Sequence, residues 1–325
     1  MNVAVLGATG AVGRTMLRVL VERGFPVTRL VPLASPRSLG ATLEWCGRAW
    51  QVGVPAAGAF EGCAIALFSA GAARSREWAP VAAAEGAVVI DNSSAWRMDA
   101  DVPLVVPEVN GEAVERRPRG IIANPNCATI QMVLPLAGLA RAAGLSRVIA
   151  TTFQSVSGAG NRGVDALHAE QAGETAQDSP FVTRIAGNVV PWIGPRLDSG
   201  WNEEEEKIRN ETRKILDLPA LEVAATCVRV PVEVGHAVAV TADLGSVLSA
   251  AEAAEAIRAV PGVELYGGDR DPTPAEIAGQ DVVRVGRLRR DPDRENVVHF
   301  WVVGDNLRKG AATNAVQIAE RVCHG

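Results

Sequence analysis

Short apolar runs alternate with amphipathic or turn-rich segments over the first 125 residues of the chain. Helices are predicted over 14–23, where apolar residues recur about every 3.6 positions, and over 79–85, where Gly86 offers a C-cap. The apolar runs predict five strands, at 2–6, 27–33, 64–68, 87–90 and 104–106. Strands that alternate with helices are typical of a parallel α/β sheet, so we expect a Rossmann-like domain here.

The pattern changes near residue 128, where the predicted strands become longer and fewer helices separate them. Helices are predicted over 202–216 and 248–260, and the last twenty residues contain an amphipathic helix with Val316 and Ile318. Strands are predicted at 148–156, 221–234, 237–244 and 296–303. This grouping favours an α+β domain with a mixed sheet. We therefore divide the chain into a nucleotide-binding domain of 1–127, a second domain of 128–305 and a C-terminal segment of 306–325.

One stretch, 120–140, carries no charge and resembles a membrane span in that respect alone. It contains Asn124, Asn126, Gln131 and Pro135, which a lipid-facing helix tolerates poorly. We predict instead a buried strand, a turn and a helix. The N-terminus has neither a basic segment nor an apolar run of signal length, so we expect a cytoplasmic protein without a membrane partner.

Composition and charge narrow the class of protein further. Hydrophobic residues make up 48% of the chain and charged residues 21%, which is enough apolar material for packed cores. The formal net charge of −5 argues against a nucleic-acid-binding role, which normally requires a basic surface. Five cysteines without a C-x-x-C pair exclude a disulfide framework and give no metal-ligand pattern.

A glycine-rich turn stands between the first predicted strand and the first predicted helix, with the sequence Gly7-Ala8-Thr9-Gly10-Ala11-Val12-Gly13. Glycines at such a turn allow close approach of a pyrophosphate, and the helix N-terminus offers it free amides. A tight turn that binds nothing has the same local pattern. The predicted cofactor contacts are Gly7, Thr9, Gly10, Ala11, Val12 and Gly13.

The end of the second predicted strand bears on which dinucleotide is bound. An NAD site usually has a carboxylate there, whereas this chain has Ser35, Arg37 and Ser38, with no acidic residue before Glu44. Hydroxyls and a guanidinium suit the 2′-phosphate of NADP. The residues therefore favour NADP(H), although an exposed arginine turn is the plain alternative.

A second turn, Asn124-Pro125-Asn126-Cys127, ends the apolar strand predicted at 120–123. Here Cys127 stands where a helix is predicted to begin, and a helix N-terminus stabilises a thiolate. The amides of that helix are also expected to hold a developing oxyanion. We predict Cys127 as a nucleophile, and a buried packing cysteine is the alternative. The other four cysteines are predicted to lie in the core.

A nucleophilic cysteine needs a partner for proton transfer, and the chain has only four histidines. His236 follows Gly235 in a turn between two long predicted strands, which favours it over His168, His299 and His324. Arg229 interrupts an otherwise apolar run. Since a buried arginine is costly unless it meets an anion, we predict that it holds a substrate carboxylate.

Taken together, these motifs resemble the bacterial aspartate-β-semialdehyde dehydrogenases over essentially the full length of the chain. The resemblance rests on the glycine turn, the Asn-Cys turn and five further segments in the same order. These are Asp91-Asn92-Ser93-Ser94-Ala95-Trp96-Arg97, Pro107-Glu108-Val109-Asn110, Gln154-Ser155-Val156-Ser157-Gly158-Ala159-Gly160, Arg229-Val230-Pro231-Val232 and Asp305-Asn306-Leu307-Arg308-Lys309-Gly310. After the histidine, many members have Ser and Glu, where this chain has Ala237 and Val238.

The resemblance implies a role for each matching residue. Cys127 forms a thioacyl intermediate, His236 is the general acid and base, and Gln154 orients the intermediate. The substrate contacts implied are Arg229 for the α-carboxylate, Glu204 for the amino group, Arg97 and Lys207 for phosphate, and Asn126 beside the nucleophile. The further cofactor contacts implied are Ser157, Gly158 and Asn306.

The resemblance also implies the reaction, which is the NADPH-dependent conversion of L-aspartyl 4-phosphate to L-aspartate 4-semialdehyde. It implies a homodimer or homotetramer with the mixed sheet at the interface, and a C-terminal segment that returns to the nucleotide domain. Two alternatives remain: a reductase of another acyl phosphate or acyl thioester, and a silent nucleotide-binding paralogue. The N-acetylglutamyl phosphate enzyme typically has Pro-Gly before its cysteine, where this chain has Asn126.

Overall fold

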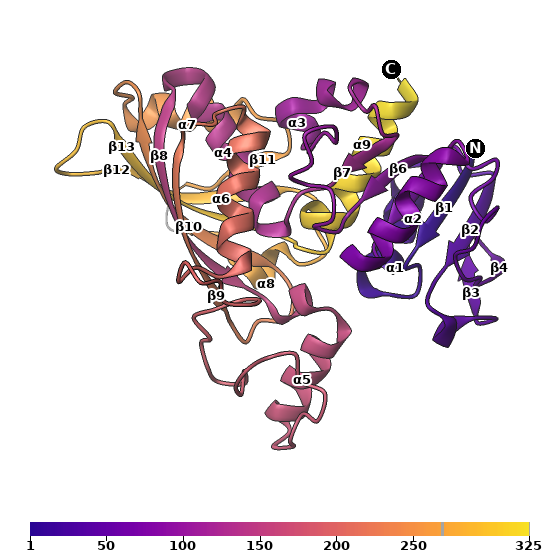
Figure 1. Cartoon of the computed structure of the whole chain (residues 1–325). Coiled ribbons are helices and arrows are strands. Elements are labelled where there is room, and N and C mark those ends of the chain that lie inside the picture. The colour runs from indigo at the N-terminus through magenta and orange to yellow at the C-terminus, as the bar shows by residue number, and fades with distance from the viewer. Residues whose placement is uncertain (268–269, 325) are drawn as a thin grey trace. The chain divides into compact units, whose positions relative to one another are not determined.

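The computed structural model describes residues 1–267 and 270–324, and its chain contacts divide it into two compact units (Figure 1). One unit comprises residues 1–125 together with 311–325, and the other comprises residues 126–310. The divisions predicted after residues 127 and 305 lie within a few residues of these.

The first unit is built on a five-stranded parallel sheet in the order β2-β1-β5-β6-β7. The strands are β1 (Asn2–Leu6), β2 (Arg29–Leu33), β5 (Ile65–Phe68), β6 (Val88–Asp91) and β7 (Ile121–Ala123). Nearly all of their residues are buried, as expected for a parallel sheet that is covered on both faces. The predicted Rossmann-like fold is thereby confirmed.

Helices and a hairpin complete this unit. They are α1 (Ala11–Glu22), α2 (Ala72–Ala84), α3 (Pro107–Asn110) and α9 (Thr313–His324), the 3₁₀ turns 36–38 and 111–115, and the hairpin of β3 (Thr42–Trp45) and β4 (Arg48–Gln51). In α9, Val316 and Ile318 are fully buried against the same core as Met16 and Leu20 of α1. The predicted C-terminal helix is confirmed.

Two predictions in this unit were wrong. Residues 104–106 form no strand, because the run lies between Pro103 and Pro107 and makes a single bridge from Leu104 to Ala123 of β7. The helix predicted at 79–85 starts earlier, at Ala72, because its first turn lacks the apolar spacing that identifies a helix. The hairpin of β3 and β4 was not predicted.

The second unit contains a six-stranded mixed sheet in the order β11-β12-β13-β10-β8-β9, which confirms the predicted architecture. Its strands are β8 (Leu145–Gln154), β9 (Glu222–Arg229), β10 (His236–Leu244), β11 (Val263–Leu265), β12 (Val283–Arg290) and β13 (Val297–Gly304). The β8–β9 and β11–β12 pairs are parallel, and the remaining pairs are antiparallel.

Helices α4 (Cys127–Ala143), α6 (Glu203–Leu216) and α7 (Ala250–Arg258) pack on this sheet (Figure 1). Helix α4 contains most of the uncharged stretch 120–140, and its residues 128–139 are all buried. The remaining helices of this unit are α5 (Asn161–Gln171), α8 (Pro274–Ile277), the 3₁₀ turn 156–159 and a π-turn at 308–312 that crosses into the first unit. Across residues 1–267 and 270–324, the longest apolar helix is too short or too polar to span a bilayer.

The sequence did not predict β12 or α5. Strand β12 carries Arg284, Arg287, Arg289 and Arg290, and only Val283, Val285 and Gly286 of this strand are buried. That exposed, basic face hides the apolar alternation on which strand prediction depends.

Candidate active site

The register of the mixed sheet brings Gln154, Arg229 and His236 to one end of it. Parallel strands β8 and β9 end together, with Gln154 paired to Arg229. Antiparallel β10 begins at the same end, where His236 pairs with Gly304, the last residue of β13. Residues that are distant along the chain thus meet where their strands begin or end.

Cys127 is the first residue of α4, and Asn126 is the N-cap. The side-chain oxygen of Asn126 accepts hydrogen bonds from the amides of Ala128 at 2.9 Å and Thr129 at 3.3 Å. The backbone amide of Asn126 donates to Glu211 at 2.6 Å. These contacts fix the start of the helix at the thiol. They also occupy two of the amides that the sequence had assigned to an oxyanion.

Glu204, in the first turn of α6, links the helix to the nucleophile turn. Its Oε1 accepts hydrogen bonds from Asn126 at 2.7 Å and from Gln154 at 3.1 Å, and its Oε2 lies 3.4 Å from Nζ of Lys207. Burial acts to raise the pKa of Glu204. Lys207, the two amide donors and Arg229 outweigh burial, so the pKa lies below its ordinary value and the carboxylate is ionised.

Arg229 is only 6% exposed, and its Nη1 donates to the carbonyl of Ser155 at 2.7 Å. Burial lowers its pKa, opposed by Glu204, but a guanidinium remains protonated under all ordinary conditions. A Cβ on Gly158 would lie 2.8 Å from Nη1 of Arg229 and 3.3 Å from Nε2 of His236. The missing side chain of Gly158 therefore leaves space beside both groups.

His236 is fully buried. Burial and the nearby positive charge of Arg229 lower the pKa of its imidazole from 6.5 to about 3, so the ring is neutral at physiological pH. Its carbonyl accepts a hydrogen bond from Gln131 at 3.1 Å. Its Nδ1 lies 3.0 Å from both the amide nitrogen and the hydroxyl of Ser155. In the described part of the chain, Nε2 has no hydrogen-bond partner.

The glycine turn of the first unit has the geometry of a dinucleotide-binding loop. A Cβ at Gly7, whose φ is +92°, would lie 2.3 Å from the carbonyl oxygen of Ser69, and one at Gly13 would lie 2.1 Å from that of Gly7. Gly10 caps α1 without any side-chain hydrogen bond. The backbone is therefore open to an anion at the helix N-terminus, which fits a pyrophosphate.

The residues predicted to select NADP lie beside this turn. The hydroxyl of Thr9, within the turn, lies 3.3 Å from the hydroxyl of Ser38, just after β2. Ser35, just before the 3₁₀ turn 36–38, and Arg37, within it, are exposed. The two predicted parts of the nucleotide site are thus joined within one unit.

Comparison with known proteins agrees with this division. A family model described as "Semialdehyde dehydrogenase, NAD binding domain" matches residues 2–117, and one described as "Semialdehyde dehydrogenase, dimerisation domain" matches residues 136–309. The aspartate-semialdehyde dehydrogenase of Aquifex aeolicus is 48% identical over 98% of this chain and 97% of its own. The chain belongs to the aspartate-semialdehyde dehydrogenase family.

Further relatives support this assignment. The aspartate-semialdehyde dehydrogenase 2 of Vibrio cholerae is 49% identical over 98% of this chain and 96% of its own. A crystal structure of aspartate semialdehyde dehydrogenase II from Vibrio cholerae complexed with ASA has a TM-score of 0.96 and 47% identity, and covers 99% of this chain and 98% of that one. The family resemblance and the enzyme class read from the sequence are confirmed.

In this aspartate-semialdehyde dehydrogenase family member, the structure distributes the predicted residues over the two units. The second unit holds Asn126, Cys127, Gln154, Ser157, Gly158, Glu204, Lys207, Arg229, His236 and Asn306. The first unit holds Gly7, Thr9, Gly10, Ala11, Val12, Gly13, Ser35, Arg37, Ser38 and Arg97. Arg97 is buried, and it donates to the carbonyls of Asn124 at 3.0 Å and Asn92 at 2.9 Å.

Sequence reasoning missed three residues that support the site. Gln131 holds the backbone of His236, Glu211 holds that of Asn126, and Ser155 contacts the imidazole itself. Gln131 was recognisable as a polar residue inside an apolar helix, and Ser155 lies within a quoted family segment. Glu211 could not be recognised from the sequence, because it is one of many charged residues in the predicted helix 202–216.

The cysteines of this family member differ from the prediction in two cases. Cys63 and Cys227 are buried as expected, and burial raises the pKa of both thiols. Cys46 and Cys323 were expected in the core but are exposed, since one stands in the turn of the β3–β4 hairpin and the other near the end of α9. Cys127 has intermediate exposure, which suits a reactive thiol.

Proposed function

We propose that the chain catalyses the NADPH-dependent reductive dephosphorylation of L-aspartyl 4-phosphate to L-aspartate 4-semialdehyde. The observation that carries this proposal is the shared end of the second sheet. It gathers a thiol at a helix N-terminus, a buried imidazole, and an oppositely charged pair formed by Arg229 and Glu204. Such a pair matches the carboxylate and the ammonium group of an amino-acid substrate.

Cys127 serves as the nucleophile in this scheme. Its thiolate attacks the acyl carbon of the acyl phosphate, phosphate leaves, and a thioacyl intermediate remains on the sulfur. Gln154, held by Thr152 at 3.0 Å and donating to Glu204, orients the intermediate. His236 is the acid–base group of the site. When bound, the nicotinamide cofactor supplies the hydride that reduces the thioacyl group.

Substrate binding is assigned by charge. Arg229 receives the α-carboxylate and Glu204 the α-ammonium group, with Asn126 beside the nucleophile. Lys207 and Arg97 are proposed to bind phosphate. The ammonium of Lys207 is one-quarter exposed and lies 3.2 Å from Glu203, so a phosphate would compete with that carboxylate.

The nucleotide-binding domain is proposed to prefer NADP(H). The glycine turn fits the pyrophosphate, and Ser35, Arg37 and Ser38 offer two hydroxyls and a guanidinium where an NAD site has a carboxylate. On the second unit, Ser157, Gly158 and Asn306 are proposed as contacts of the nicotinamide end.

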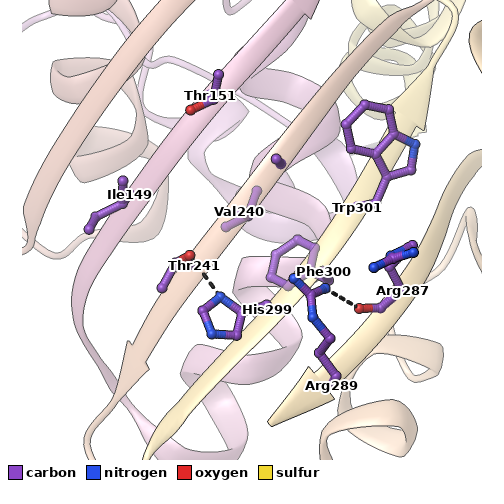
Figure 2. Close-up of a pocket in the computed structure, with 10 residues that line it drawn as sticks. Ile149, Thr151, Val240, Thr241, Arg287, Arg289, His299, Phe300 and Trp301 are labelled. Atoms are coloured by element: carbon purple, nitrogen blue, oxygen red, sulfur yellow. Dashed lines mark hydrogen bonds between the residues drawn. The ribbon is translucent and has the colours of Figure 1, made fainter. Parts of the chain in front are cut away.

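We also propose a homo-oligomer, a dimer or a tetramer, that forms through the second unit. Helices α4, α6 and α7 pack on its sheet, and a pocket of about 280 Å³ lies among side chains of β8, β10, β12 and β13 (Figure 2). Ile149 and Thr151 of β8 and Trp301 of β13 line it, and Ile149 is 38% exposed. Sheet-to-sheet packing against a second copy would cover this surface.

A cytoplasmic location is also proposed, because all five cysteines in the described part of the chain are free thiols and form no disulfide.

The test follows nicotinamide reduction at 340 nm with L-aspartate 4-semialdehyde, phosphate and either NADP⁺ or NAD⁺. We expect phosphate-dependent NADPH formation and a higher kcat/KM with NADP⁺. Activity only with N-acetylglutamate semialdehyde would favour another reductase of the same chemistry. Cofactor binding without turnover on either aldehyde would favour the silent paralogue. Sedimentation of the same sample measures the oligomeric state.

A further inference from the structure

The imidazole of His236 is held from one side by a single residue, Ser155. The backbone amide of Ser155 donates to Nδ1 of His236 at 3.0 Å. Because an amide N–H can only donate, Nδ1 must present its lone pair at this contact. A neutral imidazole with an unprotonated Nδ1 carries its hydrogen on Nε2. The backbone of Ser155 therefore selects one of the two tautomers.

The hydroxyl of Ser155 anchors this residue, and with it the amide that holds the ring, to a second group. It donates its single hydrogen to the side-chain oxygen of Asn306 at 3.0 Å, and its oxygen lies beside Nδ1 of His236 at 3.0 Å. That oxygen also accepts the amide of Gly235 at 2.9 Å, so Asn306 is tied to the residue just before His236. Every atom in this set is buried, and the position of the ring is fixed by the network.

The opposite nitrogen of the ring has no such anchor. Nε2 is buried, and no group in residues 1–267 or 270–324 forms a hydrogen bond with it. It faces the space beside Gly158 that Nη1 of Arg229 also borders. A buried N–H without an acceptor is costly, so an oxygen of a bound ligand is its natural partner. The amides of Ala128 and Thr129, which could have served instead, already donate to Asn126.

We propose that Ser155 is a positioning residue that holds His236 as the Nε2–H tautomer, so that His236 donates a hydrogen bond to the reacting carbonyl oxygen of the substrate. This inference rests on the function proposed above and narrows the role given there to His236. In this tautomer the acid–base group of the site begins as the acid, with its hydrogen on Nε2, and Cys127 enters the reaction as a thiolate stabilised by the start of α4.

The acylation step balances without proton transfer from the ring. The thiolate sulfur of Cys127 forms a bond to the acyl carbon, and the carbonyl electron pair moves to oxygen as an oxyanion. That oxyanion accepts the hydrogen bond from Nε2–H. When the carbonyl re-forms, the bond to phosphate breaks and phosphate leaves with its electron pair. The same donor serves the later oxyanion, which collapses with loss of the Cys127 thiolate.

The tautomer is measured directly by nitrogen NMR of the full-length enzyme labelled with ¹⁵N-histidine. The chain has four histidines, so a His236→Asn variant assigns the signal. We expect a protonated Nε2 and an unprotonated Nδ1 that do not titrate between about pH 8 and about pH 5, because the groups that set the charge of the ring are Arg229 and Glu204. A hydrogen on Nδ1, or a proton taken up near the ordinary pKa of histidine, overturns the proposal.

The anchoring hydroxyl is tested by Ser155→Ala, which keeps the backbone amide. We expect kcat to fall about tenfold, the effect of one hydrogen bond, while KM for the aldehyde stays near its starting value because Arg229 and Glu204 are untouched. The control is Ser146→Ala at the opposite end of β8, the strand that precedes Ser155; its hydroxyl donates to the carbonyl of Asp243, and the substitution should leave kcat unchanged. Unchanged kcat in Ser155→Ala overturns the anchoring role.

These measurements separate the inference from the proposed function. If the unaltered enzyme shows no phosphate-dependent turnover of aspartate semialdehyde, the proposed function fails whatever the tautomer. If it turns over normally and Nδ1 carries the hydrogen, the inference alone fails. Should Ser155→Ala not fold, the spectra of the unaltered enzyme still decide the tautomer.

Discussion

Two helices of this protein, one in each unit, begin at residues that we propose as functional, and their N-termini are built in opposite ways. Helix α1 starts after Gly10 with no side-chain cap, within a turn where Gly7 and Gly13 leave room for a ligand. Helix α4 starts at Cys127, and Asn126 satisfies two of its first amides. Both helix dipoles favour negative charge at this end. The open terminus suits the binding and release of an anion, whereas the cap at the other terminus fixes the position of Cys127.

The two helix N-termini also differ in the amides that they can offer to an oxyanion. At α1, free amides can serve a phosphate, but at α4 the cap uses the amides of Ala128 and Thr129. Those two amides are therefore not free for an oxyanion, and we infer that the buried Nε2 of His236 is the donor. The same local motif, a strand followed by a turn and a helix, thus has different chemistry according to its cap.

The largest effect is expected from Cys127→Ser at the capped terminus. A serine hydroxyl is barely ionised at neutral pH, so kcat should fall by about a thousandfold or more, while NADPH binding to the first unit is retained. Steady-state turnover and titration of cofactor fluorescence measure the two properties. Cys323→Ser, at an exposed cysteine, is the control for the substitution. Turnover close to normal in Cys127→Ser would rule out this nucleophile.

The open terminus is tested by a pair of glycine substitutions. In Gly13→Ala the new Cβ would lie 2.1 Å from the carbonyl of Gly7, so the loop must distort, and KM for NADPH should rise by about tenfold to about a hundredfold. In Gly10→Ala the nearest atom lies at 3.4 Å and φ is −78°, so little change is expected. Equal effects of the two substitutions would show that the loop does not bind the cofactor closely.

A smaller effect is expected from Gly158→Ala. Its Cβ would lie 2.8 Å from Nη1 of Arg229, and the guanidinium must shift, so KM for aspartate semialdehyde should rise about tenfold. The sequence assigned Gly158 to the cofactor instead. Measuring KM for aspartate semialdehyde and for NADPH distinguishes a substrate-side role from a cofactor-side role. A rise in KM confined to NADPH would assign Gly158 to the nucleotide.

The smallest effect is a difference in acid stability between the units. The pKa of His236 is about 3 in the folded unit against 6.5 unfolded, so the unfolded form takes up the proton first and stability is lost as pH falls from about 6.5 towards about 3. The lowered pKa of Glu204 acts in the same direction below about 4.5. In the first unit, burial raises the pKa of Asp91, although hydrogen bonds from Ser93 oppose this shift. Asp91 therefore contributes to stability in the opposite direction, because the folded form takes up its proton first as the pH falls.

Hydrogen exchange at pH 7 and at about pH 4.5 measures this difference. Strands β8 and β10 should lose protection on acidification before β1 and β6 do. Earlier loss in the first unit would contradict the assignment of the acid-sensitive groups.

The parts of the fold that sequence predicted well are those with a strong local pattern. Sequence patterns identify strands β1, β5, β8 and β10 by their apolar runs, and α9 by its helical spacing. They do so because burial on one or both faces requires apolar residues at those positions. Strand β12 escaped notice because arginines occupy its exposed positions. The run at 104–106 was wrongly predicted as a strand, because the prediction considered only its apolar residues and not the prolines on either side of it.

For the site, the sequence by itself determined the chemical groups: a cysteine after an Asn-Pro-Asn turn, a lone histidine between two strands, a buried arginine and a glycine loop. Such groups are visible because their residue types are costly or unusual in their local setting. Only the tertiary structure decided how these groups are oriented. Ser155 and His236 are separated by 81 residues and meet through strand register, and that contact selects the nitrogen that carries the hydrogen. Local sequence cannot specify such a contact, because hydrogen-bond direction depends on atoms supplied by other strands.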